Sequence, residues 1–412
     1  MNNDERNEEK KMKYDFTTIM DREGTGAKAV DKIPFENAAI KEGFSKIPMW
    51  VADMNFATAP SVIKEMQKRL EHPAFGYFDV TNDYCASIIE WQKVRNGVTE
   101  LPKEAIGYEN GVLGGVASVL QAFTAPGEAV LLHSPTYIGF THTIDNLGRR
   151  IIHSPLKKDE QGVWRMDYED MDKKLKENHI HLAIFCSPHN PCGRVWERSE
   201  IEKAMEVYEK NQCLVISDEI WSDLILKGHK HIPTQSVNEY AHEHTFAFYA
   251  PSKTFNLAGL VGSYHIVYNE YLRDRMLEIE KCGHYNSANV LSVSALMGAY
   301  KPEGAEWVDE LCEVLTSNVD YAYDYITTHF EGVSVAKAQG TYMLYLDCTG
   351  WLAAHPQMSM DDLIRAGIAV GVVWQDGRPF VNPNTIRMNL AVPHTLVKEA
   401  MNRLDAYVFN AE

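Results

Sequence analysis

Three polar side chains could bring an amine, a carboxylate and an amide into one crevice: Lys253, Asp218 and Asn190. Each follows an apolar run whose length and composition predict a short buried strand, at residues 246–250, 213–217 and 181–187. Because ligands of open α/β sheets bind outside the carboxyl ends of the strands, we expect the three side chains to meet there. The sequence Asn-Pro-x-Gly, from Asn190 to Gly193, predicts a tight turn.

These groups suit chemistry on a pyridine ring that carries an aldehyde. A lysine in a desolvated site loses its proton readily, so Lys253 can act as a nucleophile and form a Schiff base with the aldehyde. A carboxylate such as Asp218 can keep the pyridine nitrogen protonated, which makes the ring an electron sink. Asn190 can donate a hydrogen bond to a phenolate oxygen on the same ring.

Six short stretches follow one another along the chain: Pro48-Met-Trp-Val-Ala-Asp53-Met-Asn-Phe56, Gly76-Tyr77, Asn190-Pro-x-Gly193, Asp218-Glu-Ile, Ser252-Lys-Thr-Phe-Asn256 and Arg387-Met-Asn-Leu. In these stretches, the chain from about Tyr14 onward resembles the fold-type-I pyridoxal-phosphate enzymes of the aminotransferase class I/II superfamily. Within that superfamily it most resembles the MalY/PatB group of cystathionine β-lyases.

The resemblance implies a fold and a cofactor. We expect an α/β protein of the PLP-dependent transferase type, with a mostly parallel seven-stranded sheet in a large domain and a smaller α+β C-terminal domain. The expected divisions are a disordered tail, an arm that packs with the small domain, the large domain and the small domain, at residues 1–12, 13–58, 59–300 and 301–412. The implied cofactor is pyridoxal 5′-phosphate, held by Lys253.

Arg387 and the residues from Gly111 to Leu113 are the candidate anion-binding groups. Arg387 lies between apolar neighbours on a predicted strand, and a buried guanidinium needs an anionic partner. Gly111, Val112 and Leu113 open a predicted helix, whose free N–H groups and dipole suit a phosphate. By resemblance, Arg387 and Asn190 bind the substrate and residues 111–113 cradle the cofactor phosphate. A structural ion pair is the alternative for Arg387.

The resemblance implies roles for four more side chains. Tyr137 lies flat on the pyridine face, Trp221 borders the ring, and Ser252 joins the phosphate cradle. Tyr77, which is counted with Lys253 and Asp218 among the catalytic residues, reaches across a dimer interface to the cofactor phosphate of the other subunit. The alternatives are an ordinary loop tyrosine at position 77 and a core tyrosine at position 137.

Several positions depart from the family pattern. Trp221 stands where many aminotransferases have Tyr and the carbon–sulfur lyases often have His. Ala250 replaces a common Ser, and Gly262-Ser263 lacks the Arg that many aminotransferases use on the phosphate. The stretch 370–377 does not match the usual lyase sequence, and we expect it to line the substrate side-chain pocket.

Composition and charge exclude several classes of protein. A formal net charge of -17 opposes binding to nucleic acids or to anionic membranes. No apolar run approaches a membrane span, and the charged N-terminus lacks the apolar core of a secretory signal. Seven cysteines without a repeating spacing indicate reduced thiols and a cytoplasmic protein. Neither Cys186 with Cys192 nor His229 with His231 continues into a metal-site spacing, so we expect no metal.

The rest of the pattern predicts strands alternating with helices, which is typical of a mostly parallel sheet with helices on both faces. Helices are expected at 59–70, 84–96, 111–123, 198–210, 288–300, 306–330 and 396–409. Further strands are expected at 130–133, 264–267, 340–346 and 385–390.

Three functions stay open. The leading hypothesis is a β-lyase that cleaves S-linked L-amino acids such as cystathionine by α,β-elimination. Transamination of L-amino acids is the alternative, because it needs the same Lys253, Asp218 and Arg387. A regulatory cofactor-binding protein is the third, although no basic domain precedes the fold and the net charge opposes DNA binding. We expect a homodimer with shared active sites and a small-molecule amino-acid substrate.

Overall fold

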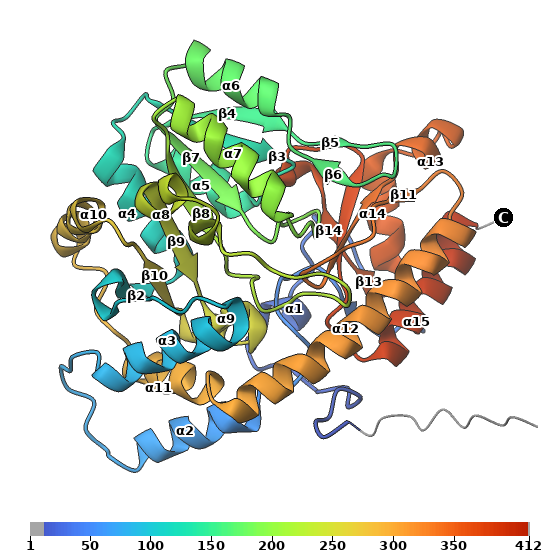
Figure 1. Ribbon diagram of the computed structural model, residues 1–412. Coiled ribbons are helices and arrows are strands. Elements are labelled where there is room, and N and C mark those ends of the chain that lie inside the picture. The colour runs from blue at the N-terminus through green and yellow to red at the C-terminus, as the bar shows by residue number, and fades with distance from the viewer. Residues whose placement is uncertain (1–11, 411–412) are drawn as a thin grey trace, which may run out of the picture.

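Residues 12–410 are described by a computed structural model, and their main element is a seven-stranded sheet (Figure 1). Neighbouring strands are parallel, except that β10 is antiparallel to both β2 and β9. In spatial order the strands are β2 (Ile106–Asn110), β10 (Gly262–Ile266), β9 (Thr245–Tyr249), β8 (Leu214–Asp218), β7 (Leu182–Cys186), β3 (Ala129–Ser134) and β4 (Arg150–Pro155). The predicted mostly parallel sheet is confirmed. The predicted tail at 1–12 lies outside the described residues, apart from Met12.

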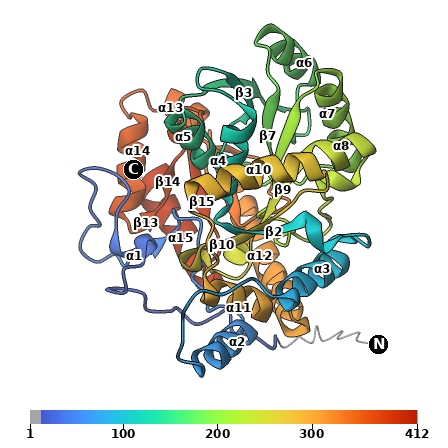
Figure 2. The same ribbon diagram turned by 90° about the vertical axis from the view of Figure 1, so that its left-hand side faces the viewer.

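The large sheet is covered by helices on both faces, because successive apolar side chains of its strands enter two different layers. In β3, Val130 and Leu132 pack with one set of helices, whereas Leu131 packs with the other. Figure 2 shows the two layers on opposite sides of the sheet. The first layer contains α4 (Val112–Phe123), α5 (Ile138–Asn146) and α10 (Glu270–Gly283), and the second contains α6 (Tyr168–Glu177), α7 (Arg198–Lys210) and α8 (Glu239–His244).

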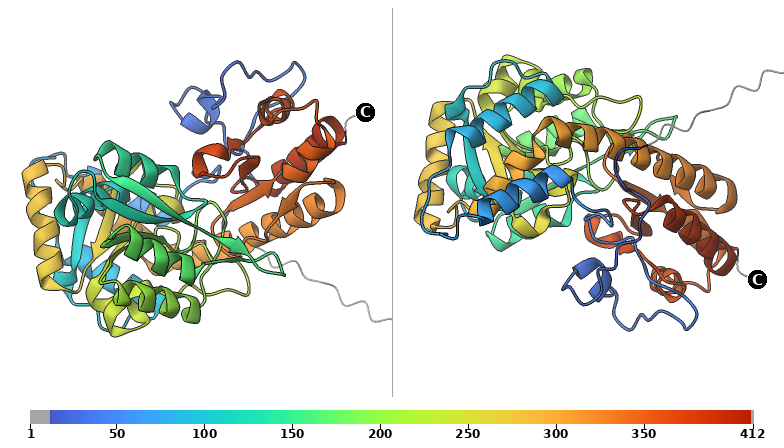
Figure 3. Two further views of the ribbon diagram at one scale, coloured as in Figure 1. Left: turned by 90° about the horizontal axis from the view of Figure 1, so that it is seen from above. Right: turned by 90° about the horizontal axis from the view of Figure 1, so that it is seen from below.

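The C-terminal part of the chain forms an antiparallel four-stranded sheet to one side of the large sheet (Figure 3). Its order is β11 (Ser334–Val335), β12 (Met343–Asp347), β15 (Thr385–Asn389) and β14 (Gln375–Asp376). The long helix α12 (Pro302–His329) connects the two regions, since it contacts α2 (Pro60–Leu70) and α11 (Val290–Ala299) as well as β11 and α15 (His394–Leu404). Two shorter helices, α13 (Thr349–Ala354) and α14 (Met360–Ala369), complete this part.

The N-terminal segment runs along the C-terminal sheet before the chain enters α2. Its strand β1 (Ile47–Pro48) pairs in parallel with β13 (Val372–Val373). The side-chain amide of Asn389 donates to the carbonyl oxygen of Val51 at 2.7 Å. These contacts fix the path of residues 47–53 across the small sheet. The divisions at residues 58 and 300 stay a prediction.

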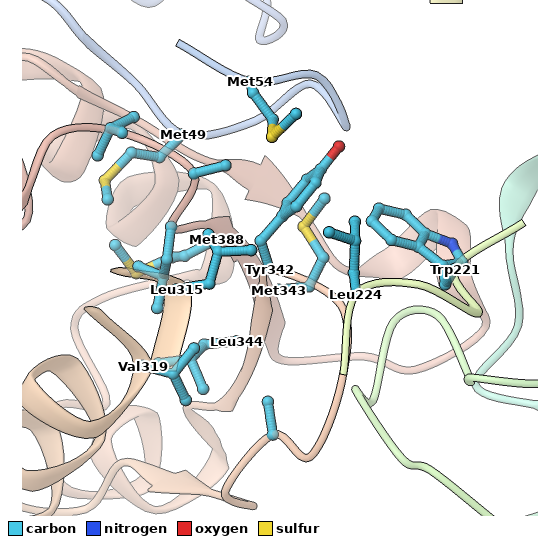
Figure 4. Packing of buried hydrophobic residues seen from close by; sticks show 14 of the residues in the cluster. Met49, Met54, Trp221, Leu224, Leu315, Val319, Tyr342, Met343, Leu344 and Met388 are labelled. Carbon is cyan, nitrogen blue, oxygen red and sulfur yellow. The ribbon is translucent and has the colours of Figure 1, made fainter. Parts of the chain in front are cut away.

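One hydrophobic cluster joins segments that are distant in the sequence (Figure 4). Tyr342, Met343 and Leu344 of the C-terminal sheet region pack in it together with Leu315 and Val319 of α12. The same cluster contains Met49 and Met54 of the N-terminal segment and Trp221 and Leu224 of the loop after β8. Burial of these side chains therefore positions the N-terminal segment and the loop after β8 relative to each other.

Some element boundaries differ from the prediction. Helix α12 begins at Pro302 rather than at residue 306, because proline at the first helical position lacks only an N–H that would be unpaired there anyway. Helix α15 ends at Leu404 and continues as a π-helical turn over Asp405–Phe409. The predicted strand at 340–346 begins only at Met343, because the preceding Thr341 adopts a positive φ of 66°.

Candidate active site

The large sheet opens at the carboxyl ends of β7, β8 and β9 into a cavity of about 200 Å³. Asn190, Asp218 and Lys253 lie in its wall, so the structure brings together the three polar side chains that were expected to meet. The full lining is Ala52, Gly111, Val112, Leu113, Tyr137, Cys186, Asn190, Asp218, Ile220, Trp221, Ser252, Lys253, Ala258 and Val261.

Asp218 ends strand β8 with its carboxylate buried beside the cavity, where it is 4% exposed. Its Oδ1 accepts a hydrogen bond from the backbone N–H of Ile220 at 3.1 Å. Burial raises the pKa of this carboxyl to about 7, although the positive charge of Lys253 lowers it. A protonated ring nitrogen against Asp218 would give the buried carboxylate the positive partner that it lacks among the described residues.

Glu219, the next residue, points away from the cavity into a buried hydrogen-bond network. Its carboxylate accepts from the hydroxyl of Tyr249 at 2.7 Å and from the backbone N–H of Thr234 at 3.0 Å. His231 Nε2 lies 2.8 Å from the same carboxylate. These hydrogen bonds hold the pKa of Glu219 below its usual value despite complete burial. His231 is therefore a loop residue that satisfies a buried acid, a role that the sequence did not predict.

Lys253 lies in the short helix α9 (Pro251–Thr254), which follows β9 directly. Its Nζ donates a hydrogen bond to the carbonyl oxygen of Ala52 at 2.9 Å and lies 5.6 Å from the centroid of the Trp221 ring. Burial, followed by the positive charge of Arg387, lowers the pKa of this amine to about 8. The amine therefore loses its proton far more readily than an ordinary lysine, as a nucleophile requires.

Arg387, at the centre of β15, approaches this region from the C-terminal sheet and is 4% exposed. One guanidinium nitrogen donates to Asn190 Oδ1 at 3.1 Å, and another donates to the carbonyl oxygen of Trp50 at 2.9 Å. The guanidinium carbon lies 4.7 Å from the centroid of the Phe380 ring. Because Asn190 uses its amide oxygen for Arg387, its amide nitrogen is the group that can donate to a ligand.

Arg387 has no carboxylate partner among the described residues, and its Nε makes no hydrogen bond there. Burial lowers the pKa of this guanidinium to about 10, which shows how poorly the positive charge is compensated. The alternative of a structural ion pair therefore finds no support in the geometry. A buried cation without an anion is costly, so Arg387 suits an incoming carboxylate.

The turn between β2 and α4 places Gly111, Val112 and Leu113 on the cavity wall. Gly111 has a φ of 85°, in the left-handed region that favours glycine. Helix α4 begins at the next residue, so its first N–H groups have no partner within the helix. Together with Ser252, which precedes Lys253, these residues form what we call the phosphate cradle, residues 111–113 and 252.

Tyr137 and Trp221 give the cavity two aromatic walls. Tyr137 stands immediately before α5, and its ring takes up the space beside Gly139, where a Cβ atom would lie 2.4 Å from the ring. Trp221 is 2% exposed and lies edge-on to Tyr342, with the ring centroids 4.8 Å apart. The hydroxyl of Tyr342 is buried and has no hydrogen-bond partner among the described residues. Trp221 thus belongs to the hydrophobic cluster on one side and to the cavity on the other.

Tyr77 lies outside this cavity. It belongs to the segment between α2 and α3 (Asn82–Asn96), which loops outward at the lower left of Figure 1. Its side chain is fully exposed. Together with its neighbours in residues 75–80 it borders a different hollow of about 640 Å³, beside Tyr108, residues 286–288 and Val290. The structure of one chain therefore does not bring Tyr77 to the other site residues.

The chain matches the model of the aminotransferase class I and II family over residues 45–404. It belongs to this family. Cystathionine β-lyase PatB of Bacillus subtilis is 34% identical over 74% of the chain and 78% of PatB. Protein MalY of Escherichia coli is 31% identical over 94% of the chain and 97% of MalY. A crystal structure of the PLP-bound C–S lyase of Staphylococcus hominis shares 29% identity and superposes with a TM-score of 0.84, covering 95% of this chain and 98% of that one.

Enzymes of this family depend on pyridoxal 5′-phosphate, and the cavity suits that group. Lys253 offers a readily deprotonated amine for the aldehyde, and Asp218 offers a buried carboxylate for the ring nitrogen. Gly111 precedes helix α4 on the cavity wall, and the first N–H groups of that helix, which have no partner within it, suit a phosphate. Among the described residues that line the cavity, none is an arginine, so the cradle depends on backbone N–H groups and Ser252.

Sequence reasoning missed three contributors to the site. The carbonyl oxygens of Ala52 and Trp50 hold Lys253 and Arg387, and Phe380 stacks on Arg387. The stretch from Pro48 to Phe56 is recognisable in the sequence, but backbone acceptors carry no residue-specific pattern. Residues 370–377 are outside the lining of this cavity, since Val372 and Val373 pair with β1 and the Trp374 indole N–H donates to the buried carbonyl of Ile364. Their place in the substrate side-chain pocket stays a prediction.

Proposed function

We propose that the protein is a pyridoxal-phosphate-dependent carbon–sulfur β-lyase, which cleaves S-linked L-amino acids such as cystathionine to a thiol, pyruvate and ammonia. The observation that carries the proposal is an easily deprotonated Lys253 and a buried Asp218 in the wall of one cavity, with the Arg387 guanidinium hydrogen-bonded to Asn190 of the same wall. The similarity to PatB and to a C–S lyase of known structure supports elimination as the reaction.

Each residue has a role that follows from its surroundings. Bound pyridoxal 5′-phosphate supplies an aldehyde that links to an amine and a ring that withdraws electrons from the substrate Cα. Arg387 binds the substrate α-carboxylate, which fixes the Cα–H bond relative to Lys253. Lys253, freed once the substrate amine takes its place on the aldehyde, would then take the proton from Cα as a neutral amine. Asp218 would hold the proton on the ring nitrogen of the bound cofactor, so that the ring can accept the electrons from Cα.

The charge and polarity of the cavity lining also limit which substrate side chains fit. Among the described residues of its lining, Lys253 is the one cation and Asp218 the one acid. A substrate with a second carboxylate at its β-carbon, such as aspartate, would find no guanidinium there to pair with. The remaining lining is mostly apolar or aromatic, which suits a thioether. We therefore propose S-substituted cysteines as the substrate class.

Incubation of the purified protein with cystathionine tests this function most directly. Pyruvate should form without any keto-acid acceptor, together with one equivalent of thiol. A strict requirement for an acceptor would show transamination instead, because then the amino group must leave on the cofactor. Binding of the cofactor without turnover of any amino acid would favour the regulatory role.

We propose in addition that the protein is a homodimer in which Tyr77 serves the active site of the partner subunit. The cradle has no arginine among its described residues, yet a phosphate with nearly two negative charges needs several donors. Tyr77 is exposed and outside the lining of its own cavity, on a segment that can meet a second chain. Such an arrangement would supply a hydroxyl donor to a phosphate cradle that has few hydrogen-bond donors of its own.

We further propose that the protein works in the cytoplasm. All seven cysteines are free thiols, and six of them are buried or half-buried. Thiols persist in a reducing compartment. No helix within residues 12–410 is long and apolar enough to cross a bilayer.

A further inference from the structure

A buried group of three titratable side chains lies outside the active-site lining, close to the phosphate cradle. Glu109 belongs to β2, His265 to β10 and Glu280 to α10, and their exposed fractions are 0%, 1% and 4%. One nitrogen or oxygen atom from each lies within 4.8 Å of the others. Glu109 precedes Gly111 by only two residues, so this group sits at the base of the cradle.

The hydrogen bonds within the group leave one carboxyl oxygen unpaired. Glu109 accepts from the hydroxyl of Tyr285 at 2.7 Å, and its other oxygen lies 2.6 Å from His265 Nδ1. Glu280 accepts from the side-chain amide of Asn286 at 2.9 Å through one oxygen. Its second oxygen is buried without a hydrogen-bond partner among the described residues. An unpaired buried carboxyl oxygen of this kind is unfavourable unless a proton or a cation joins it.

Within residues 12–410, no cation pairs with either of the two carboxyls. His265 stays neutral, because burial lowers its pKa to about 4. Arg273 of α10 faces the same region but donates to the backbone carbonyl of Val267 at 3.2 Å. Burial raises the pKa of Glu109 to about 7 and that of Glu280 to about 8, and the Glu109 charge adds to the effect on Glu280. Two adjacent buried carboxyls cannot both be ionised at neutral pH without such a cation.

A metal ion does not explain the group. The 2.6 Å between His265 Nδ1 and Glu109 Oε1 is the length of a direct hydrogen bond, and two ligands of one ion would be held farther apart. A proton satisfies the same carboxyl pair without any change of geometry.

The group is linked to the phosphate cradle through the segment that follows α10. The backbone N–H of Asn110 donates to the side-chain oxygen of Asn286 at 2.8 Å, and the Asn110 side chain donates to the carbonyl of Ser287 at 2.9 Å. The Tyr285 ring covers Gly114 in the first turn of α4, where a Cβ atom would lie 2.6 Å from it. Tyr285 and Asn286 thus contact the carboxyl pair on one side and the residues flanking Gly111 on the other.

We propose that Glu109 and Glu280 share one proton, and that this pair positions the phosphate cradle through Tyr285 and Asn286. Loss of the proton places two negative charges side by side in a buried site. Glu280 then moves away from Glu109 together with Asn286, and the turn at Gly111 loses its support. Retention of the cofactor should consequently weaken as the pH rises through the titration of the pair. This last step rests on the proposed placement of the cofactor phosphate, whereas the shared proton does not.

The test compares the wild-type holoenzyme with Glu280→Gln, which keeps a hydrogen-bonding side chain but removes one ionisable group. Glu278→Gln is the matched control, since Glu278 lies on the same helix with its side chain 60% exposed. Hydrogen exchange of residues 284–290 and the cofactor released on dilution are measured from pH 6.5 to 9. In wild type, the protection factor should fall by up to about tenfold per pH unit while one proton is lost. In Glu280→Gln, exchange protection should stay constant, and cofactor retention should keep only the pH dependence that Lys253 and Asp218 give it.

Infrared spectroscopy supplies a readout that does not involve the cofactor. Wild type at pH 6.5 should show the band of a protonated buried carboxyl, and Glu280→Gln should change it while Glu278→Gln does not. An unchanged band, or equal pH dependence of exchange in all three proteins, would overturn the shared proton. A titrating band and titrating exchange, with cofactor retention that depends on pH equally in wild type and Glu280→Gln, would overturn only the link to the cradle. If Glu280→Gln fails to fold, Tyr285→Phe replaces it and should shift the midpoint of the same pH profile.

Discussion

Arg387 donates a hydrogen bond of 3.1 Å to the side-chain oxygen of Asn190, across 197 positions of the sequence. Arg387 belongs to the C-terminal sheet, and Asn190 follows strand β7 of the large sheet. The residue proposed for the substrate carboxylate and the residue proposed for the cofactor ring are therefore positioned by each other. Neither of them pairs with a carboxylate among the described residues, which leaves the guanidinium charge available to a ligand.

Replacement of Arg387 should damage substrate binding more than folding. Arg387→Lys loses the planar fork that suits a carboxylate, so kcat/KM should fall by about ten- to hundredfold, the equivalent of one hydrogen bond to a charged group. The thermal midpoint should change little, because no ion pair of the described protein is broken. Arg378→Lys, an exposed arginine paired with Asp376 and Asp361, is the control and should keep full activity. Equal losses of activity in the two variants would contradict the assignment.

Lys253→Ala should abolish both turnover and the visible absorbance of the covalently held cofactor. Lys253 is the lysine among the described residues that line the cavity, and alanine has no amine that could bond to an aldehyde. Lys173→Ala, which removes an exposed lysine of α6, should change neither. Survival of the absorbance band and of activity in Lys253→Ala would mean that another amine holds the cofactor.

The rate of cofactor attachment to the apoprotein should depend on pH through Lys253. Attack on the aldehyde needs the neutral amine, and burial lowers the pKa of Lys253 from 10.5 to about 8. The attachment rate, followed by absorbance after rapid mixing, should therefore rise with pH up to about 8 and then level off. A rate that kept rising toward 10.5 would show an amine with the pKa of an exposed lysine.

Tyr77→Phe should weaken cofactor binding without weakening the isolated chain. The hydroxyl is exposed in one chain, so its loss costs nothing in folding. If it binds the phosphate in the partner subunit, its loss should weaken cofactor affinity by about 0.5–3 kcal/mol, the range for one hydrogen bond. Equilibrium dialysis of the cofactor measures this, with Tyr271→Phe as an exposed control. Sedimentation that showed a fully active monomer would exclude the shared site.

Local patterns were enough to predict the sheet and the residues at its strand ends. Strands β7, β8 and β9 are mostly apolar runs because both of their faces are buried. Runs of this kind can be recognised from the sequence alone. The polar residue after each run then has to lie at the carboxyl edge of the sheet. The turn that ends at Gly193 could also be predicted from its residue types, and the φ of 65° at Gly193 is one that favours glycine.

The surroundings of those residues depended on contacts between distant segments. Two acids in sequence, Asp218 and Glu219, have opposite environments, because one faces the cavity and the other a buried network around His231. The absence of a carboxylate beside Arg387 among the described residues, and the carbonyl of Ala52 beside Lys253, follow from how the C-terminal sheet and the N-terminal segment pack.

The sequence by itself thus determined which residue types stand at the strand ends, since strand length and burial are encoded locally. Only the tertiary structure decided their charge states and partners. A pKa depends on burial and on every charge within a few ångströms, and those neighbours come from elements far apart in the chain. Glu109 and Glu280 illustrate the point: 171 positions separate them in the sequence, yet the packing of β2 against α10 joins them into one titrating pair.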